Sequence, residues 1–82
     1  MKTDTTYPIL VRDPKEIGAL VRQARKQARL KQAEAAAMCG VGTRFLSDLE
    51  NGKPTLHLGK TLQVVKAFGL TVLIKNKELT DD

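Results

Sequence analysis

The chain of 82 residues has few of the side chains on which cross-linking, metal binding or membrane insertion depends. Cys39 is the only cysteine, so no intrachain disulfide can form, which fits a reducing cytoplasm. His57 is the only histidine, so we expect no metal cluster. The apolar runs are too short to span a membrane, and no charged-then-apolar signal sequence opens the chain. These absences predict a cytoplasmic protein with no membrane partner.

Catalytic constellations are also missing from the sequence. No nucleophile–base pair, carboxylate dyad or phosphate-binding loop is visible, so we expect no enzyme, no cofactor and no small-molecule ligand. The length suffices for one domain with one small core, which is marginally stable by itself. Dimerisation would add to that stability.

Positive charge is present in excess and is unevenly distributed. The formal net charge is +5, and residues 12–31 carry seven Lys or Arg against two acids. The last seven residues reverse the balance, with one Lys against three acids. A basic chain attracts polyanions, but this property alone does not establish DNA binding.

The apolar spacing and the cap residues predict a mainly α fold. Asp13 as N-cap, Pro14 at the first helical position and Glu16 three residues after the cap predict a helix from Pro14 to about Ala28. A second helix is expected over Gln32–Cys39, ended by Gly40 with positive φ. A third should run from Thr43 to Glu50 or Asn51. A fourth should run from about Leu58 to Phe68, with His57 or Thr55 as cap, and present Leu58, Leu62, Val65 and Phe68 to the core.

Two segments outside the predicted helices have β-favouring composition. Residues 7–12 predict an edge strand or an extended arm, because Pro8 cannot donate to a ladder. Residues 70–75 form a β-branched apolar run that predicts a strand. A lone strand needs a partner, which either residues 7–12 or a second protomer can supply.

The second and third predicted helices, joined by a tight turn, suit DNA binding. Outward side chains near the start of the third helix are expected to reach base edges, and Arg44 can bond guanine O6 and N7 bidentately. Asp48 can accept from cytosine N4 or orient Arg44 one turn away. The expected base contacts are Thr43, Arg44, Ser47 and Asp48. The expected phosphate contacts are Arg29, Lys31, Gln32, Gly42, Asn51 and Lys53.

The order of these motifs resembles the Xre/Cro-type helix-turn-helix family of bacterial and phage repressors. The matching residues are Gln32, Ala36, Gly40-Val41, Leu46 and Leu49-Glu50-Asn51-Gly52-Lys53, and the resemblance covers roughly residues 17–70. It implies a lambda-repressor-like bundle of four to five helices. It also implies an ion pair between Arg25 and Glu50, which the position of Arg25 at the border of its helix face supports independently.

The flanking residues resemble the HipB-type antitoxins, as the stretches over residues 7–22 and 52–77 indicate. In that group the strand after the fourth helix pairs with its twin, so the resemblance implies a homodimer through Leu70, Val72, Leu73 and Ile74. It further implies repression of the chain's own operon at an inverted-repeat operator, and binding of a HipA-type Ser/Thr kinase toxin.

We therefore expect an N-terminal arm over residues 1–12, a DNA-binding domain over 13–69, a dimerisation strand over 70–75 and a tail over 76–82. The leading hypothesis is a dimeric antitoxin that represses transcription and is associated with the nucleoid when bound to its operator. Two alternatives remain: a stand-alone or phage-like repressor with no toxin partner, and an inhibitory protein-interaction module that does not contact DNA.

Overall fold

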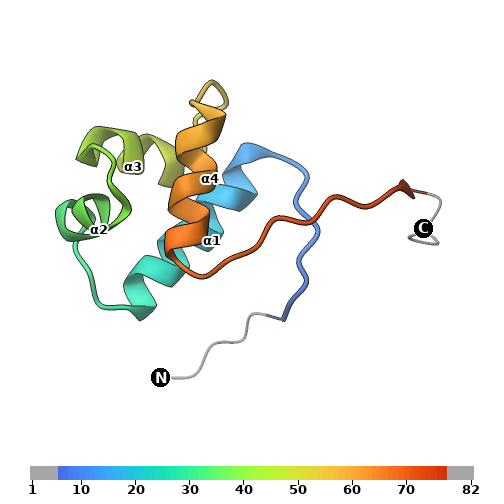
Figure 1. The fold of residues 1–82 in the computed structure, drawn as a ribbon, viewed down its shortest axis with the longest axis horizontal. Coiled ribbons are helices and arrows are strands. Elements are labelled where there is room, and N and C mark those ends of the chain that lie inside the picture. The colour runs from blue at the N-terminus through green and yellow to red at the C-terminus, as the bar shows by residue number, and fades with distance from the viewer. Residues whose placement is uncertain (1–5, 78–82) are drawn as a thin grey trace.

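The computed structural model describes residues 6–77, so the ends of the predicted arm and tail, residues 1–5 and 78–82, lie outside it. The described residues form four helices (Figure 1): α1 Pro14–Gln27, α2 Gln32–Cys39, α3 Thr43–Glu50 and α4 Leu58–Ala67. Helix α1 packs against α3, and α2 packs against both α3 and α4. The predicted mainly α helix-turn-helix fold is confirmed.

Helix α1 begins and ends with local hydrogen bonds that its sequence provides. Asp13 Oδ1 accepts from the backbone N–H of Glu16 at 3.2 Å, and Pro14 occupies the first turn, as predicted. At the other end the chain reverses at Arg29, and the N–H of Leu30 donates to the carbonyl of Arg25 at 3.2 Å. This closure points the chain directly into α2.

The core lies where the four helices meet, and small residues allow them to approach closely. Val21, Ala35, Leu46 and Val64 are completely buried. Gly18 of α1 faces the end of α3, where a β-carbon would come within 2.2 Å of the carbonyl oxygen of Leu49. Because only glycine fits this contact, α3 is held against α1 at a short and fixed distance.

The predicted core face of α4 is partly wrong. Thr61, Val64 and Val65 are the buried residues of α4, whereas Leu58 and Leu62 are exposed. Helix α4 carries apolar side chains on two sides, and the side with Val64 fits against α2. Leu58 instead borders an open cleft together with Leu56 of the preceding loop.

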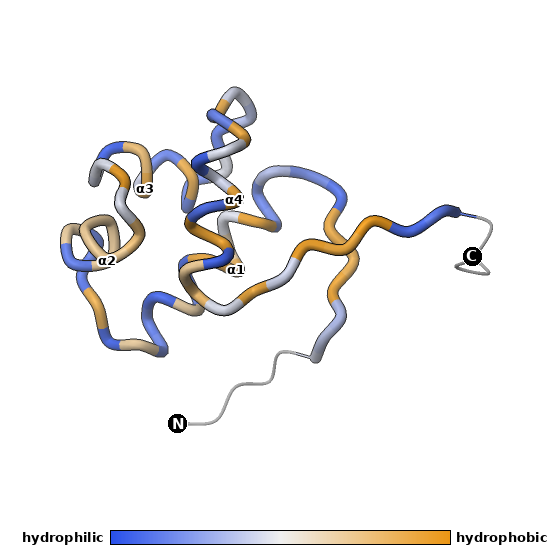
Figure 2. The backbone as a smooth tube through the Cα atoms, in the orientation of Figure 1, coloured by the Kyte–Doolittle hydropathy of each residue, from blue (hydrophilic) through white to orange (hydrophobic). Residues whose placement is uncertain are grey.

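The strand predicted over residues 70–75 does not form in the described chain, and residues 7–12 take the extended-arm alternative rather than an edge strand. No strand is present among residues 6–77, and Figure 1 shows residues 7–12 and 70–75 as extended segments beyond the helices. Figure 2 shows that both segments are hydrophobic along much of their length. Their backbone groups have no ladder partner in the described part of the chain, so pairing of residues 70–75 with residues 7–12 is not observed.

Candidate nucleic-acid interface

The turn between α2 and α3 is built on glycine, as predicted. Gly40 ends α2 with φ of 75°, and the N–H of Val41 donates to the carbonyl of Ala36 at 3.0 Å. Gly42 is the N-cap of α3 and, having no side chain, forms no capping hydrogen bond to the first amides. Val41 packs against the core from the turn. The start of α3 is therefore anchored on one side, and its first amides remain available to an anion.

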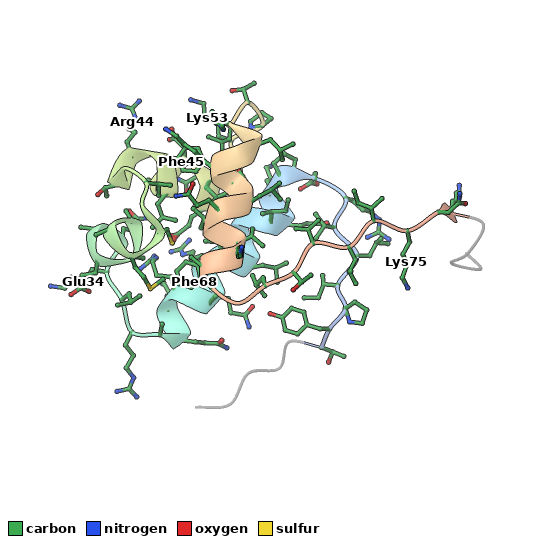
Figure 3. The ribbon with its side chains drawn as sticks, in the orientation of Figure 1. Glu34, Arg44, Phe45, Lys53, Phe68 and Lys75 are labelled. Carbon is green, nitrogen blue, oxygen red and sulfur yellow. The ribbon has the colours of Figure 1, made fainter. Side chains whose placement is uncertain are left out.

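Helix α3 has a buried face and an exposed face that agree with its sequence. Leu46 and Leu49 are buried, and Phe45 packs at the edge of the core. Thr43 and Arg44 are exposed, whereas Ser47 and Asp48 are half-buried. Figure 3 shows Arg44 projecting away from the helices, and its side chain is 92% exposed. This geometry leaves the start of α3 open to a large ligand.

Asp48 lies between two cations at the exposed side of α3. Its Oδ2 is 4.0 Å from Arg44 Nε and 3.7 Å from Lys53 Nζ. Exposed pairs at such distances contribute little to stability because water and salt screen them. They bias the two cations towards one side of α3 while leaving both able to move onto a stronger anion.

The expected ion pair between Arg25 and Glu50 is present. Arg25 Nε is 2.6 Å from Glu50 Oε2, Arg25 Nη2 is 3.0 Å from Oε1, and both residues are buried. Burial alone raises the pKa of Glu50, but hydrogen bonds from Arg25 and Gln32, together with the charges of Arg25 and Arg22, lower it below its usual value. The hydrogen bond to Glu50 raises the pKa of Arg25. The pair is therefore charged and joins α1 to α3.

Gln32, expected at a phosphate, makes a contact that the sequence did not predict. Its Nε2 donates to Glu50 Oε1 at 3.1 Å, which adds α2 to the buried pair. The sequence feature that could have indicated this contact is the carboxylate of Glu50, because a buried carboxylate can accept more hydrogen bonds than one guanidinium donates to it. The amide nitrogen carries two N–H groups, so the second is left for another acceptor.

Arg29 and Lys31 flank the start of α2, and both are exposed. Arg29 is the non-glycine residue with positive φ among residues 6–77, at 61°. The N–H of Lys31 donates to Glu34 Oε1 at 2.8 Å, which closes the first turn of α2. An arginine in a backbone conformation that favours glycine carries local strain.

The connection after α3 is compact and places two further polar residues at the surface. Asn51 and Lys53 are both exposed, and the N–H of Lys53 donates to the carbonyl of Asp48 at 3.0 Å. Gly52 between them has φ of 80° and packs against Lys15, where a β-carbon would come within 2.6 Å of that side chain. Figure 3 shows Lys53 and Arg44 along the same edge of the molecule.

The residues expected at a dimer contact differ in exposure. Leu70 packs against the core, whereas Val72, Leu73 and Ile74 are exposed, with Ile74 at 95%. Leu58 and Leu62 of α4 are also exposed, so apolar side chains of both segments are left uncovered.

The described residues include no group of three or more His, Cys, Asp or Glu side chains that could hold a metal ion. None of the described helices is both long enough and apolar enough to cross a membrane. Cys39 is buried, and burial raises the pKa of its thiol, which makes it a poor nucleophile.

Residues 16–73 match the helix-turn-helix domain family, which covers most of the chain. The chain belongs to the helix-turn-helix domain family. The uncharacterized HTH-type transcriptional regulator y4mF of Sinorhizobium fredii is 50% identical over 62 residues, which are 76% of this chain and 82% of y4mF. This helix-turn-helix chain is thus a DNA-binding transcriptional regulator by family.

Other similarities are more distant or partial. The ImmF control region 10 kDa protein of Bacillus phage phi105 is 46% identical over 41 residues, which span half of this chain and 46% of the phage protein. The fold is similar to that of HipB in a HipA-HipB-O2-O3 complex and in an O4 20mer complex. In both comparisons the TM-score is 0.74 at 17% identity, covering 85% of this helix-turn-helix chain and 99% of the other. At that identity the likeness establishes the fold.

Proposed function

We propose that this chain is a dimeric, operator-specific repressor that acts as the antitoxin of a HipA-type Ser/Thr kinase toxin and represses its own operon. The observation that carries the DNA-binding part is the exposed start of α3, where Arg44 projects into solvent while the buried Arg25–Glu50 pair fixes the other end of the helix. A helix that is held rigidly at its C-terminal end and exposed at its N-terminal end suits the major groove.

The individual contacts follow from the geometry of α3 and its neighbours. The base edges are read by Thr43, Arg44, Ser47 and Asp48. Arg44 leaves its 4.0 Å contact with Asp48 and binds a guanine. The phosphates are held by the exposed cations of Arg29, Lys31 and Lys53, by Asn51, by the second N–H of Gln32 and by the open amides after Gly42. These contacts flank α3 on both sides.

The dimer forms through residues 70–75. Val72, Leu73 and Ile74 expose apolar side chains, and the extended backbone around them has no ladder partner among residues 6–77. Pairing with the same segment of a second copy satisfies the backbone groups and covers the side chains. Two copies of α3 then lie about 34 Å apart in successive major grooves, so the operator is an inverted repeat.

The toxin partner is supported by resemblance rather than by a contact. The flanking segments resemble HipB-type antitoxins, and a similar fold occurs in a HipA-HipB-O2-O3 complex. The similarity to the phage phi105 control-region protein favours a second candidate, a phage-like repressor without a toxin. Both candidates share the DNA-binding surface and differ only in the protein partner.

Gel shifts with the promoter region upstream of the gene test the DNA-binding part. We expect a sequence-specific shift at moderate salt that a scrambled duplex of equal length does not compete away. Absence of such a shift would favour a protein-interaction module that does not contact DNA. Co-purification with a kinase encoded beside the gene distinguishes the antitoxin from the phage-like repressor, which would retain DNA binding and recover no kinase.

A further inference from the structure

We propose that Gln32 is a positioning residue that fixes the angle between α2 and α3 and thereby sets how α3 meets base edges. The proposal rests on the DNA-binding function proposed above. It concerns the hydrogen bond from Gln32 Nε2 to Glu50 Oε1, at 3.1 Å. The role is additional to any phosphate contact, because one N–H of the amide is directed at Glu50.

The position of this hydrogen bond in the chain makes it a brace. Gln32 is the first residue of α2 and Glu50 is the last residue of α3. The turn through Gly40 joins the two helices at their other ends. The two helices are therefore connected twice. The turn joins the end of α2 to the start of α3, and the hydrogen bond joins the start of α2 to the end of α3.

Glu50 is a firm anchor for the brace. Arg25 donates to both of its oxygens, and Arg25 Nη1 also donates to the carbonyl of Leu30 at 2.9 Å, in the connection that leads into α2. Arg25 and Glu50 are both buried, whereas Gln32 is half-buried. A side chain attached to a buried and fully paired group is held in one orientation.

The length of the helices shows why a hydrogen bond between the start of α2 and the end of α3 controls the angle between them. A helix of eight residues is about 12 Å long, so a slack of about 1 Å at its far end permits a rotation of roughly 5° about the turn. Helix α3 is fixed to α1 through Gly18 and the Arg25–Glu50 pair, so α2 is the helix that moves. The phosphate contacts of α2 then shift relative to the side chains of α3 that read bases. The phosphate contacts and the base contacts can no longer reach good hydrogen-bond geometry at the same time.

The brace predicts a change that a phosphate contact or a purely structural role would not cause. Loss of a phosphate contact weakens binding to all sequences alike. Loss of stability lowers the melting temperature without altering which bases are preferred. Loss of the brace reduces discrimination between base pairs at the positions that α3 reads.

The test compares Gln32→Met with the matched control Gln27→Met, since Gln27 is exposed at the end of α1. In the free protein, NMR titration should place the pKa of Glu50 higher in Gln32→Met than in the wild type, because a hydrogen bond that lowers it is gone. In selections from a half-site library, discrimination should fall about fivefold, the factor for one ordinary hydrogen bond. Gln27→Met should change neither quantity.

An unchanged pKa of Glu50, or a loss of affinity that is equal for all sequences, would overturn the proposal. If Gln32→Met does not fold, Gln32→Asn keeps the amide but is too short to reach Glu50, and it should show the same two effects. A wild-type protein that selects no sequence at all would contradict the proposed function, while the titration still tests the brace by itself.

Discussion

Arg25 and Glu50 form a buried ion pair in which the guanidinium contacts both carboxylate oxygens, at 2.6 and 3.0 Å. The pair joins the last turn of α1 to the last residue of α3, which directly precedes the connection that carries Asn51 and Lys53. Both residues are buried, so the pair fixes the end of α3 without belonging to the exposed surface that we propose to meet DNA.

Breaking this pair should destabilise the fold strongly. Arg25→Ala leaves the carboxylate of Glu50 buried and without its main partner, so the free energy of unfolding should fall by about 3–5 kcal/mol. Urea denaturation measures the change. The control Lys26→Ala, at an exposed position of the same helix, should stay within about 0.5 kcal/mol of the wild type. Equal effects of the two variants would mean that the pair does not support the bundle.

The same pair makes stability depend on acid pH. The pKa of Glu50 is lower in the folded chain than in the unfolded chain, so the unfolded chain binds its proton first as the pH falls. The contribution of Glu50 is therefore fully present above its unfolded pKa of about 4.3, and it is lost as the pH falls through the lower folded value. Thermal melting between pH 7 and pH 2 should show this decline, and Glu50→Gln should be less stable at pH 7 but flatter in this window. An identical pH profile for Glu50→Gln would show that other carboxylates cause the decline.

Arg29 should trade stability for DNA affinity. Its φ of 61° favours glycine, so Arg29→Gly should increase the free energy of unfolding by about 1 kcal/mol. The same change removes a cation from the proposed phosphate contacts, and the slope of log affinity against log salt should flatten by about one unit. Arg29→Ala should give the same slope without the gain in stability, since alanine keeps the strain. A slope equal to that of the wild type in both variants would make Arg29 an ordinary surface residue.

A proline in the C-terminal segment should separate the protomers. Val72→Pro removes a backbone N–H that the proposed ladder needs, so sedimentation should show a monomer at concentrations where the wild type is a dimer. Val72→Ala keeps the N–H and should remain mostly dimeric. A dimer that persists in Val72→Pro places the contact elsewhere, and the exposed side chains of Leu58 and Leu62 are then the next surface to test.

Local signals in the sequence were sufficient to predict the four helices and the turn. Asp13 and Pro14 define the start of α1, and Gly40 defines the end of α2, because each acts through its own backbone or the backbone nearby. The Arg25–Glu50 pair came from the resemblance to a family and is present. The proposed base and phosphate contacts remain predictions.

What the sequence did not predict depends on distant parts of the chain. Helix α4 is apolar on two sides, so its sequence cannot decide whether Leu58 or Val64 faces the core, and packing against α2 decides it. The strand over 70–75 has the right composition but needs a partner that the described chain does not supply. The hydrogen bond of Gln32 joins residues far apart in sequence, and only the folded arrangement brings them together.

Methylation interference on the chain's own promoter tests most directly whether α3 reads the major groove. Methylation of guanine N7 blocks the contact that Arg44 is expected to make. We predict that methylation at one guanine in each half of an inverted repeat prevents binding of the wild-type protein. The Arg44→Ala variant should lose about 1–3 kcal/mol of binding free energy and become insensitive to methylation at that guanine. Binding that is unaffected by guanine N7 methylation and unchanged in Arg44→Ala would contradict the account.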